Sequence, residues 1–189
     1  METYLEAYLT YETKEGRRFE ARFPPAEGWE DGHLLSVRPS FTLTGSGLRL
    51  GLSLLAHRPL TLLAFEVRGP LPAWADLETL TLVNGFQSWS RTEELLPYRR
   101  QRKLSPLAWF LRPYGEPVRE RVHGSGRFHS WWFTHLRRPG HALLLGSTDE
   151  RSGFTLFGVE WPGRTWWARK DCGGRHLEGG EEYRLCGLF

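Results

Sequence analysis

Short runs of alternating apolar and polar residues constrain the fold of this chain more than any other feature of its sequence. Tyr4–Tyr11 (YLEAYLTY), Arg18–Phe23 (RFEARF) and His33–Val37 alternate in this way and are bounded by Gly or Pro. Such alternation places successive side chains on opposite faces of a half-buried strand. No segment shows sustained helical periodicity, so the pattern predicts an all-β chain.

Similar runs recur along most of the chain and are separated by residues that favour turns. In Phe41–Leu55 the tripeptide Gly45-Ser46-Gly47 is compatible with a hairpin turn between two alternating runs. The further expected strands are Leu60–Val67, Leu77–Val83, Phe128–His135, His141–Ser147, Gly153–Trp161, Arg164–Arg169 and Glu182–Leu188. This spacing predicts a large antiparallel β-sandwich, or supersandwich. The 189 residues suit one domain over 1–189, or two small sheets that share a core.

One long segment, Ser90–Arg121, breaks the alternation. It contains the basic run Arg99–Lys103, and prolines recur at Pro97, Pro106, Pro113 and Pro117. Loops longer than about 15 residues are uncommon in compact domains and tend to be functional or disordered. We expect a long irregular loop around residues 90–121 that walls a site, contacts a partner or is simply solvated. Only Glu93–Arg100 and Pro106–Leu111 could hold a short helical turn.

The charge pattern argues against polyanionic partners, and the lack of a long apolar run argues against a membrane-spanning segment. The formal net charge is +3 and the isoelectric point is near 9.1, but acidic residues lie among the basic ones along most of the chain. No apolar run approaches the roughly 20 residues that span a bilayer, and Met1–Tyr4 lacks a basic region followed by an apolar stretch. We expect a cytoplasmic protein without nucleic-acid or membrane partners. The lone asparagine, Asn84, fits the avoidance of this thermolabile residue in thermophiles.

The cysteines and histidines do not form a recognisable metal or cofactor motif. Cys172 and Cys186 could pair across a hairpin, although two thiols without a secretion signal are more often free. Four histidines recur at a spacing of six, but no carboxylate or cysteine completes a metal cage around them. These histidines are His123, His129, His135 and His141. We predict neither a metal site nor a cofactor.

The strongest local feature is Asn84–Ser90 (NGFQSWS), which follows an expected strand and opens the long loop. Asn before Gly suits a turn that needs positive φ, and turn geometry alone would explain it. The residues after the turn add amide, hydroxyl and indole groups, which are the groups that hold a sugar. Planar amides pair with sugar hydroxyls, and an indole packs on the apolar face of a pyranose. Trp89 could equally serve as core packing.

Other clusters have simpler structural explanations. Each of the pairs Trp131-Trp132 and Trp166-Trp167 is expected to place one indole in the core and one on the surface, where it meets a domain interface or a sugar. Asp171–Gly174 fits a turn. The remaining aspartates are scattered beside turns, and no Ser-His-Asp or Cys-His arrangement has local context. We predict no catalytic residues in this chain.

The segment Leu82–Ser90 resembles the Asn-(Gly/Asn)-aromatic-Gln-Ser-Trp motif in the N-terminal β-sandwich domain of α-galactosidases of glycoside hydrolase family 36. Three weaker similarities follow in the same order as in that family, at Ser130–Phe133, Ala142–Ser147 and Leu177–Leu185. The resemblance covers roughly Leu77–Phe189. Phe86 stands where relatives often carry Trp or Tyr, and Trp131 stands where many carry Asp, which leaves substrate preference open.

In that family the sandwich precedes a (β/α)₈ barrel that carries two catalytic aspartates in a retaining mechanism. The resemblance implies that such a barrel follows Phe189 and that the chain itself is non-catalytic. It further implies that Trp89 walls the galactoside pocket of the barrel. Asn84, Phe86 and Gln87 would shape the loop and contact the sugar at the edge of the domain.

Two alternatives stay open at the level of sequence. The chain could be a free-standing lectin-like module that binds glycans through exposed tryptophan, or a scaffold for oligomerisation without a ligand. A sandwich separated from its barrel exposes an apolar patch, and such patches favour self-association. We therefore also expect a homo-oligomer.

Overall fold

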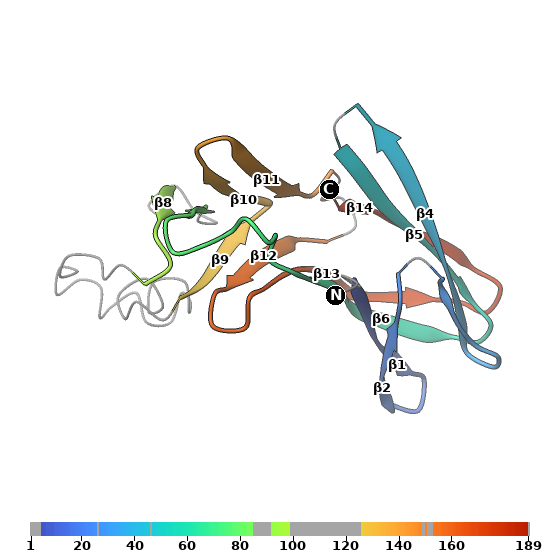
Figure 1. Cartoon of the computed structure of the whole chain (residues 1–189). Helices are drawn as coiled ribbons and strands as arrows, with labels where there is room; N and C mark the ends of the chain where they lie inside the picture. Colours follow the sequence, from blue (N-terminus) through green and yellow to red (C-terminus); the bar gives the residue numbers. More distant parts are fainter. Residues whose placement is uncertain are drawn as a thin grey trace, which may run out of the picture. The chain divides into compact units, whose positions relative to one another are not determined.

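The computed structural model describes residues 5–25, 27–45, 47–84, 92–98, 126–148, 150 and 153–188. These residues form strands and turns, and none of them lies in a helix (Figure 1). They therefore include no apolar helix of the length that a membrane crossing requires. The chain divides into two compact units, and the single domain expected over 1–189 stays a prediction. The first unit comprises Met1–Gly69, Gly146–Thr155 and Trp167–Phe189, and the second Pro70–Leu145 and Leu156–Trp166.

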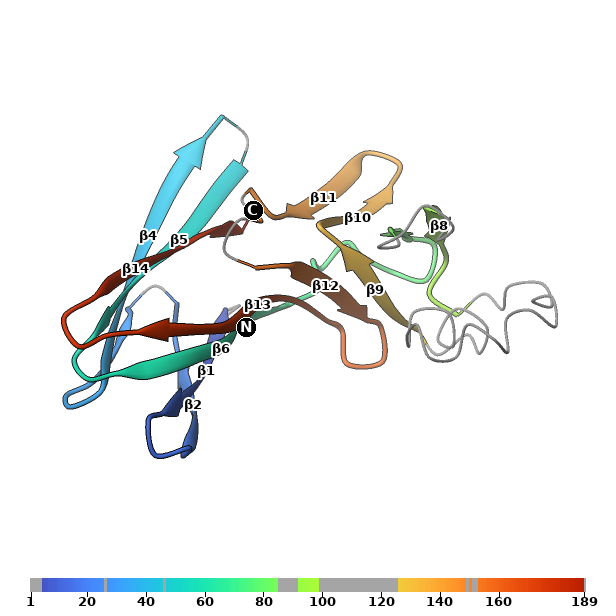
Figure 2. The ribbon, with the colours of Figure 1, turned by 180° about the vertical axis from the view of Figure 1, so that it is seen from behind.

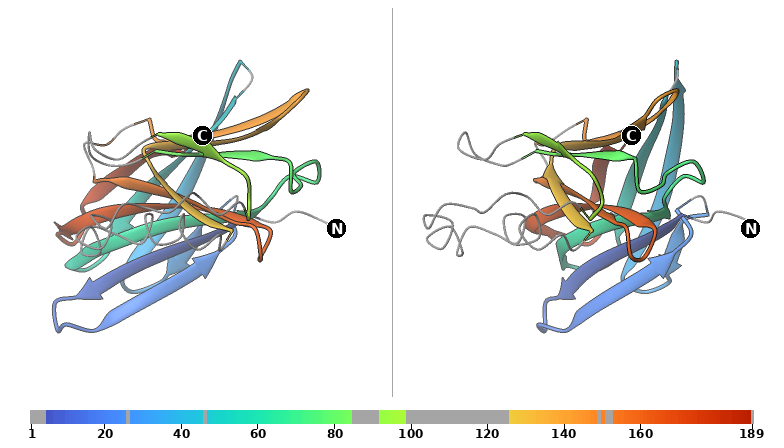
Figure 3. Two further views of the ribbon diagram at one scale, coloured as in Figure 1. Left: turned by 90° about the vertical axis from the view of Figure 1, so that its left-hand side faces the viewer. Right: turned by 60° about the vertical axis from the view of Figure 1, so that its left-hand side comes forward.

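The first unit contains two four-stranded groups. One follows the order β2-β1-β6-β13 and the other β14-β5-β4-β3, and β1 and β2 form a hairpin (Figure 3). The strands of the first group are β1 (Glu6–Thr13), β2 (Arg18–Phe23), β6 (Leu60–Pro70) and β13 (Thr165–Leu177). Those of the second group are β3 (Trp29–Asp31), β4 (Leu35–Thr44), β5 (Gly47–Ala56) and β14 (Glu182–Leu188).

The core of the first unit follows from the alternation in the sequence. Ala7, Leu9 and Tyr11 of β1 are buried, because every second side chain of the strand points to the same face. Tyr11 reaches the other group of strands: its ring centroid lies 6.4 Å from that of Trp29, and its hydroxyl donates to Asp31 Oδ2 over 3.3 Å. Aromatic contacts thus join the two groups face to face, and the predicted antiparallel β-sandwich is confirmed.

The second unit is built from shorter strands. One sheet has the order β11-β10-β7-β8, and β12 pairs with β9 (Figure 2). Its strands are β7 (Leu80–Val83), β8 (Glu93–Leu95), β9 (Arg127–Trp131), β10 (Phe133–Arg138), β11 (His141–Gly146) and β12 (Thr155–Glu160). The buried core cluster consists of Leu71, Ala75, Val83, Leu95, Phe128, Leu136, Val159 and Trp161. The indole of Trp161 donates to Thr81 Oγ1 over 3.2 Å, so its polar edge is satisfied inside this core.

Two strand predictions and one turn prediction are wrong in their details. The expected strand His33–Val37 and the first run of Phe41–Leu55 form one continuous strand, β4. The expected strand Phe128–His135 is interrupted at Trp132, where a φ of 69° turns the chain from β9 into β10. The turn expected at Asp171–Gly174 lies within β13. Gly173 and Gly174 adopt φ values of 61° and 70°, so the strand continues through an irregularity that the two glycines allow.

The long loop and the tryptophan pairs also differ from expectation. Glu93–Leu95 forms β8 instead of a helical turn, because it pairs with β7. The proposed turn at Pro106–Leu111 lies outside the described residues. Trp132 is the exposed member of its pair, but Trp131 is half-buried and not a core residue, since the strand breaks between them. Trp166 and Trp167 are both half-buried.

Cys172 is a free, buried thiol on β13. Burial, and secondly the neighbouring Asp171 carboxylate, raise the pKa of this thiol to about 12. A thiol that stays protonated is a poor nucleophile. Cys172 therefore serves as a small core residue.

Candidate functional site

The predicted site begins at Asn84, directly after strand β7 in the second unit. The backbone of Asn84 is tied to strand β9: its N–H donates to Ser130 Oγ over 2.8 Å, and its carbonyl accepts from the N–H of Trp131 over 2.9 Å. Ser130 is 2% exposed, and its hydroxyl donates onward to the carbonyl of Phe133 over 2.5 Å. One buried serine thus connects the end of β7 to the start of β10.

The side chain of Asn84 is also bound by the protein. Its Nδ2 donates to the carbonyl of Trp131 over 3.1 Å, and its Oδ1 accepts from Thr92 Oγ1 over 2.7 Å. An amide offers two N–H donors and two lone pairs, so among the described residues each end of the Asn84 amide keeps one position without a partner. Asn84 is therefore a positioning residue in this structure.

The hydrogen bond between Asn84 and Thr92 joins the two residues that flank 85–91 in the chain. The predicted sugar-contacting residues Phe86, Gln87 and Trp89 lie in that interval and are outside the described residues. Their roles stay predictions, as does sugar contact by Asn84. The structure does describe the two residues on either side of this interval: the Thr92 hydroxyl donates to the side-chain amide oxygen of Asn84.

An aromatic surface lies next to this hydrogen-bonded node. Trp132 and Phe133 are each 39% exposed, and they follow Ser130 and Trp131 directly. Trp132 has a left-handed backbone conformation, which costs a non-glycine residue roughly 1–2 kcal/mol. The bonds of Asn84 and Ser130 to this stretch hold that conformation in place. The result is an exposed indole and phenyl ring beside a polar node, which are the two kinds of group that hold a sugar.

A charged cluster joins β8 to β10. Glu94 accepts from Nε and Nη2 of Arg137 through its two carboxylate oxygens, and His135 Nε2 lies 2.6 Å from Glu94 Oε1. The hydrogen bond from Arg137, followed by that from His135, lowers the pKa of Glu94 to about 2 against the effect of burial. This carboxylate is ionised at neutral pH and is unsuited to act as a general acid.

The other polar residues that could serve in catalysis or metal binding mostly make local hydrogen bonds or ring contacts. Asp76 accepts from the N–H of Glu78 over 3.0 Å, and Asp171 from that of Gly173 over 2.8 Å. Asp149 and His123 lie outside the described residues. Within the described parts of the chain, no group of three or more His, Cys, Asp and Glu is placed to hold a metal ion. His141 instead stacks on Trp74, with ring centroids 5.4 Å apart.

Sequence reasoning identified Asn84 but missed most of its partners. Thr92 had no local signal, because its contact with Asn84 depends on the pairing of β7 with β8. Ser130 lies in one of the weaker family similarities, yet its bridging role depends on a contact 46 positions away along the chain. The positive φ of Trp132 could not be anticipated from its residue type.

No protein-family model matches this chain, and a search of the curated proteins finds no match either, so inference about its function rests on its own residues.

Proposed function

We propose that this chain is a non-catalytic β-sandwich domain of an α-galactosidase-like glycoside hydrolase. In this proposal it packs on a catalytic barrel and lends the aromatic segment after Asn84 to a galactoside pocket. Trp89 stacks on the sugar, Gln87 pairs with its hydroxyls, and Phe86 shapes the segment. Asn84 positions these residues and offers its remaining donor and acceptor.

The observation that supports the proposal most is the pair of hydrogen bonds made by the side chain of Asn84. This side chain accepts from Thr92, on the other side of the interval 85–91 in the chain, and donates to the Trp131 carbonyl. Sites that recognise a ligand are preorganised when a second layer of hydrogen bonds fixes the segment that carries them. The exposed rings of Trp132 and Phe133 add an apolar surface at the same place.

The proposal is tested by assaying the pure 189-residue protein on a nitrophenyl α-galactoside, alone and mixed with a separately produced family 36 barrel. We expect negligible turnover by the chain alone. We expect the mixture to have a lower KM than the barrel alone. The variant Trp89→Ala should abolish this decrease in KM. The control variant Trp29→Phe, in the other unit, should retain it. Robust turnover by the chain alone, or a KM that the chain leaves unchanged, would overturn the proposal.

The exposure of Trp132 favours the alternative of a lectin-like module, and calorimetric titration distinguishes it from the proposed domain. A domain that supplies only part of a pocket binds galactose or raffinose weakly or not at all. A complete module binds measurably and loses that binding on Trp89→Ala or Trp132→Ala. Heat release of the second kind would favour the free-standing module.

A further inference from the structure

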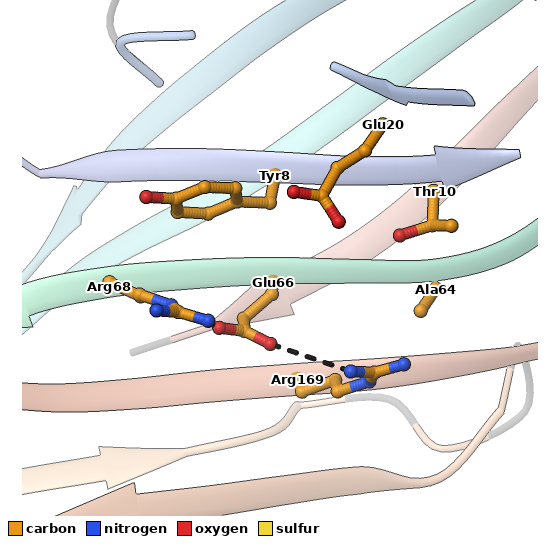
Figure 4. A pocket seen from close by; sticks show the side chains of 7 residues that line it. All are labelled: Tyr8, Thr10, Glu20, Ala64, Glu66, Arg68 and Arg169. Carbon is orange, nitrogen blue, oxygen red and sulfur yellow. Dashed lines mark hydrogen bonds and ion pairs between the residues drawn. The ribbon is translucent and has the colours of Figure 1, made fainter. Parts of the chain in front are cut away.

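A polar pocket lies on the first unit, on the face of the sheet that is turned away from its apolar core. Four neighbouring strands contribute to it (Figure 4). Its lining residues are Tyr8, Thr10, Glu20, Ala64, Glu66, Arg68 and Arg169. None of them belongs to the site described above, which is in the second unit.

The pocket exists because two short side chains face each other among long ones. Thr10 of β1 is the register partner of Glu20 on β2 and of Ala64 on β6. Ala64 contributes only a methyl group and Thr10 a small hydroxyl. The space above them measures about 70 Å³. One water molecule needs about 10–15 Å³, so the pocket admits a group of a few heavy atoms and not a whole oligosaccharide.

One side of the pocket is a fixed charged network. Glu66 is 8% exposed; it accepts from Arg68 Nε, and its Oε2 lies 3.8 Å from Arg169 Nη1. The Arg68 guanidinium lies 4.8 Å from the centroid of the Tyr8 ring, and the Tyr8 hydroxyl donates to Glu6 over 2.6 Å. A buried carboxylate held in this way is rigid and keeps its position without a ligand.

The other side of the pocket presents two polar groups that have no hydrogen-bond partner in the described part of the chain. Thr10 is 8% exposed, and within the described residues its hydroxyl makes no hydrogen bond. The carboxylate of Glu20 is exposed and likewise has no hydrogen-bond or ion-pair partner among them. The Thr10 hydroxyl is not one of the described side-chain atoms that are both fully buried and unpaired, so it is open to water or to a ligand from the pocket. The structure thus presents a donor-acceptor hydroxyl, an open carboxylate and a loosely held guanidinium around one small space.

The balance of charges in the pocket lining favours a neutral ligand. In the lining, the carboxylates of Glu20 and Glu66 balance the guanidinium groups of Arg68 and Arg169. A charged ligand would add a net charge to a lining whose own charges already balance. A neutral diol suits both signs, because its O–H groups donate to a carboxylate while its lone pairs accept from a guanidinium.

We propose that this pocket binds the vicinal diol of a neutral polyhydroxyl ligand, such as one edge of a pyranose. Glu20 accepts the two O–H groups, Arg169 donates to their oxygens, and Thr10 bonds the deeper hydroxyl. The Ala64 methyl forms the floor. The pocket is therefore a second carbohydrate-contacting site, independent of the segment after Asn84.

The test uses the full chain and saturation-transfer NMR with D-galactose, ethylammonium and inorganic phosphate as probes. We expect galactose to bind with a dissociation constant on the order of 1 mM and the charged probes not to compete. Thr10→Val, which keeps the shape and removes the hydroxyl, and Glu20→Gln should each weaken binding about tenfold. Glu30→Gln, an exposed carboxylate on β3, is the matched control and should change nothing.

The variant Trp89→Ala separates this pocket from the proposed galactoside site. Galactose binding that survives Trp89→Ala and is weakened by Thr10→Val and Glu20→Gln supports the pocket, whatever the fate of the first proposal. Absence of galactose binding overturns it. Binding that only Trp89→Ala removes, or displacement of galactose by phosphate or ethylammonium, overturns it as well.

Discussion

At the scale of single residues, Asn84 supports the candidate site with both ends of its side chain. Asn84→Ala removes the hydrogen bonds to Thr92 and to the Trp131 carbonyl. Each such loss costs about 1 kcal/mol, so we expect the free energy of unfolding to fall by about 2 kcal/mol. Urea unfolding followed by tryptophan fluorescence measures the change. Thr92→Val removes only the hydroxyl that donates to Asn84 and should lose about half as much. A Thr92→Val variant as stable as the unchanged chain would contradict the role given to Thr92.

Gly153 is a residue at which the backbone leaves no room for a side chain. Its φ is 126°, and a Cβ there would lie 1.7 Å from the carbonyl oxygen of Asp171 on β13. Gly153→Ala must displace a strand and should lower the free energy of unfolding by more than about 3 kcal/mol. Gly16 is the control, because its φ is 76° but a Cβ there would meet no atom within 4 Å. Gly16→Ala should cost only about 1 kcal/mol, and thermal unfolding of the two variants compares them.

At the scale of elements, the cluster of Glu94, His135 and Arg137 ties β8 to β10 in a pH-dependent way. The pKa of Glu94 is lowered from 4.5 to about 2 in the folded chain. Its stabilisation is therefore complete above about pH 4.5 and is lost as the pH falls toward 2. Because the Glu94 side chain is 27% exposed, we expect Glu94→Gln to cost about 1 kcal/mol at pH 7.

Urea unfolding at pH 7 and at pH 3 checks this dependence. The difference between the native protein and Glu94→Gln should shrink at the lower pH. Glu182→Gln is the control, since Glu182 lies 3.7 Å from the exposed Arg184 and its pair is weak. A difference that stays constant between the two pH values would exclude the ion pair as its cause.

Alternation predicts elements well where each strand is long and half-buried, and poorly elsewhere. Arg18–Phe23 and Glu182–Leu188 were predicted with their observed bounds. Strand β8 was missed because three residues carry no period, and its existence depends on pairing with β7. Strand β13 runs past its predicted end because two glycines let it continue with positive φ, a state that the residue type permits but does not require.

In the candidate site, too, local sequence patterns identify single residues but not the contacts between strands. Asn84 was identifiable because a lone asparagine before glycine is a strong local signal. Its contact with Ser130 spans 46 positions of the chain, and its contact with Thr92 depends on the pairing of β7 with β8, so no local pattern contains either of them. The pocket around Thr10 was invisible for this reason too, because it depends on the register that sets Thr10 between Glu20 and Ala64.

At the scale of the whole molecule, the expected self-association has a specific surface to test. Strands β4 and β5 pair along their whole length, and three large apolar side chains near their shared turn are exposed. These are Phe41 at 43%, Leu48 at 45% and Leu43 at 83%. Strand β3 pairs only with Leu35–Val37, so within the described residues the outer edge of β4 beyond Val37 has no partner strand. Pro39 removes one N–H from that edge, which limits uncontrolled pairing.

A second copy that covers the exposed side chains of this hairpin would bury apolar surface at about 25 cal/mol per Å². Sedimentation velocity over a hundredfold range of concentration should therefore show a rise in the weight-average sedimentation coefficient. Leu43→Glu places a charge at the most exposed position and should keep the protein monomeric over that range. Leu77→Glu, at a residue 64% exposed in the second unit, is the matched control and should associate like the native chain. Loss of association in the control but not in Leu43→Glu would place the contact away from the β4–β5 hairpin.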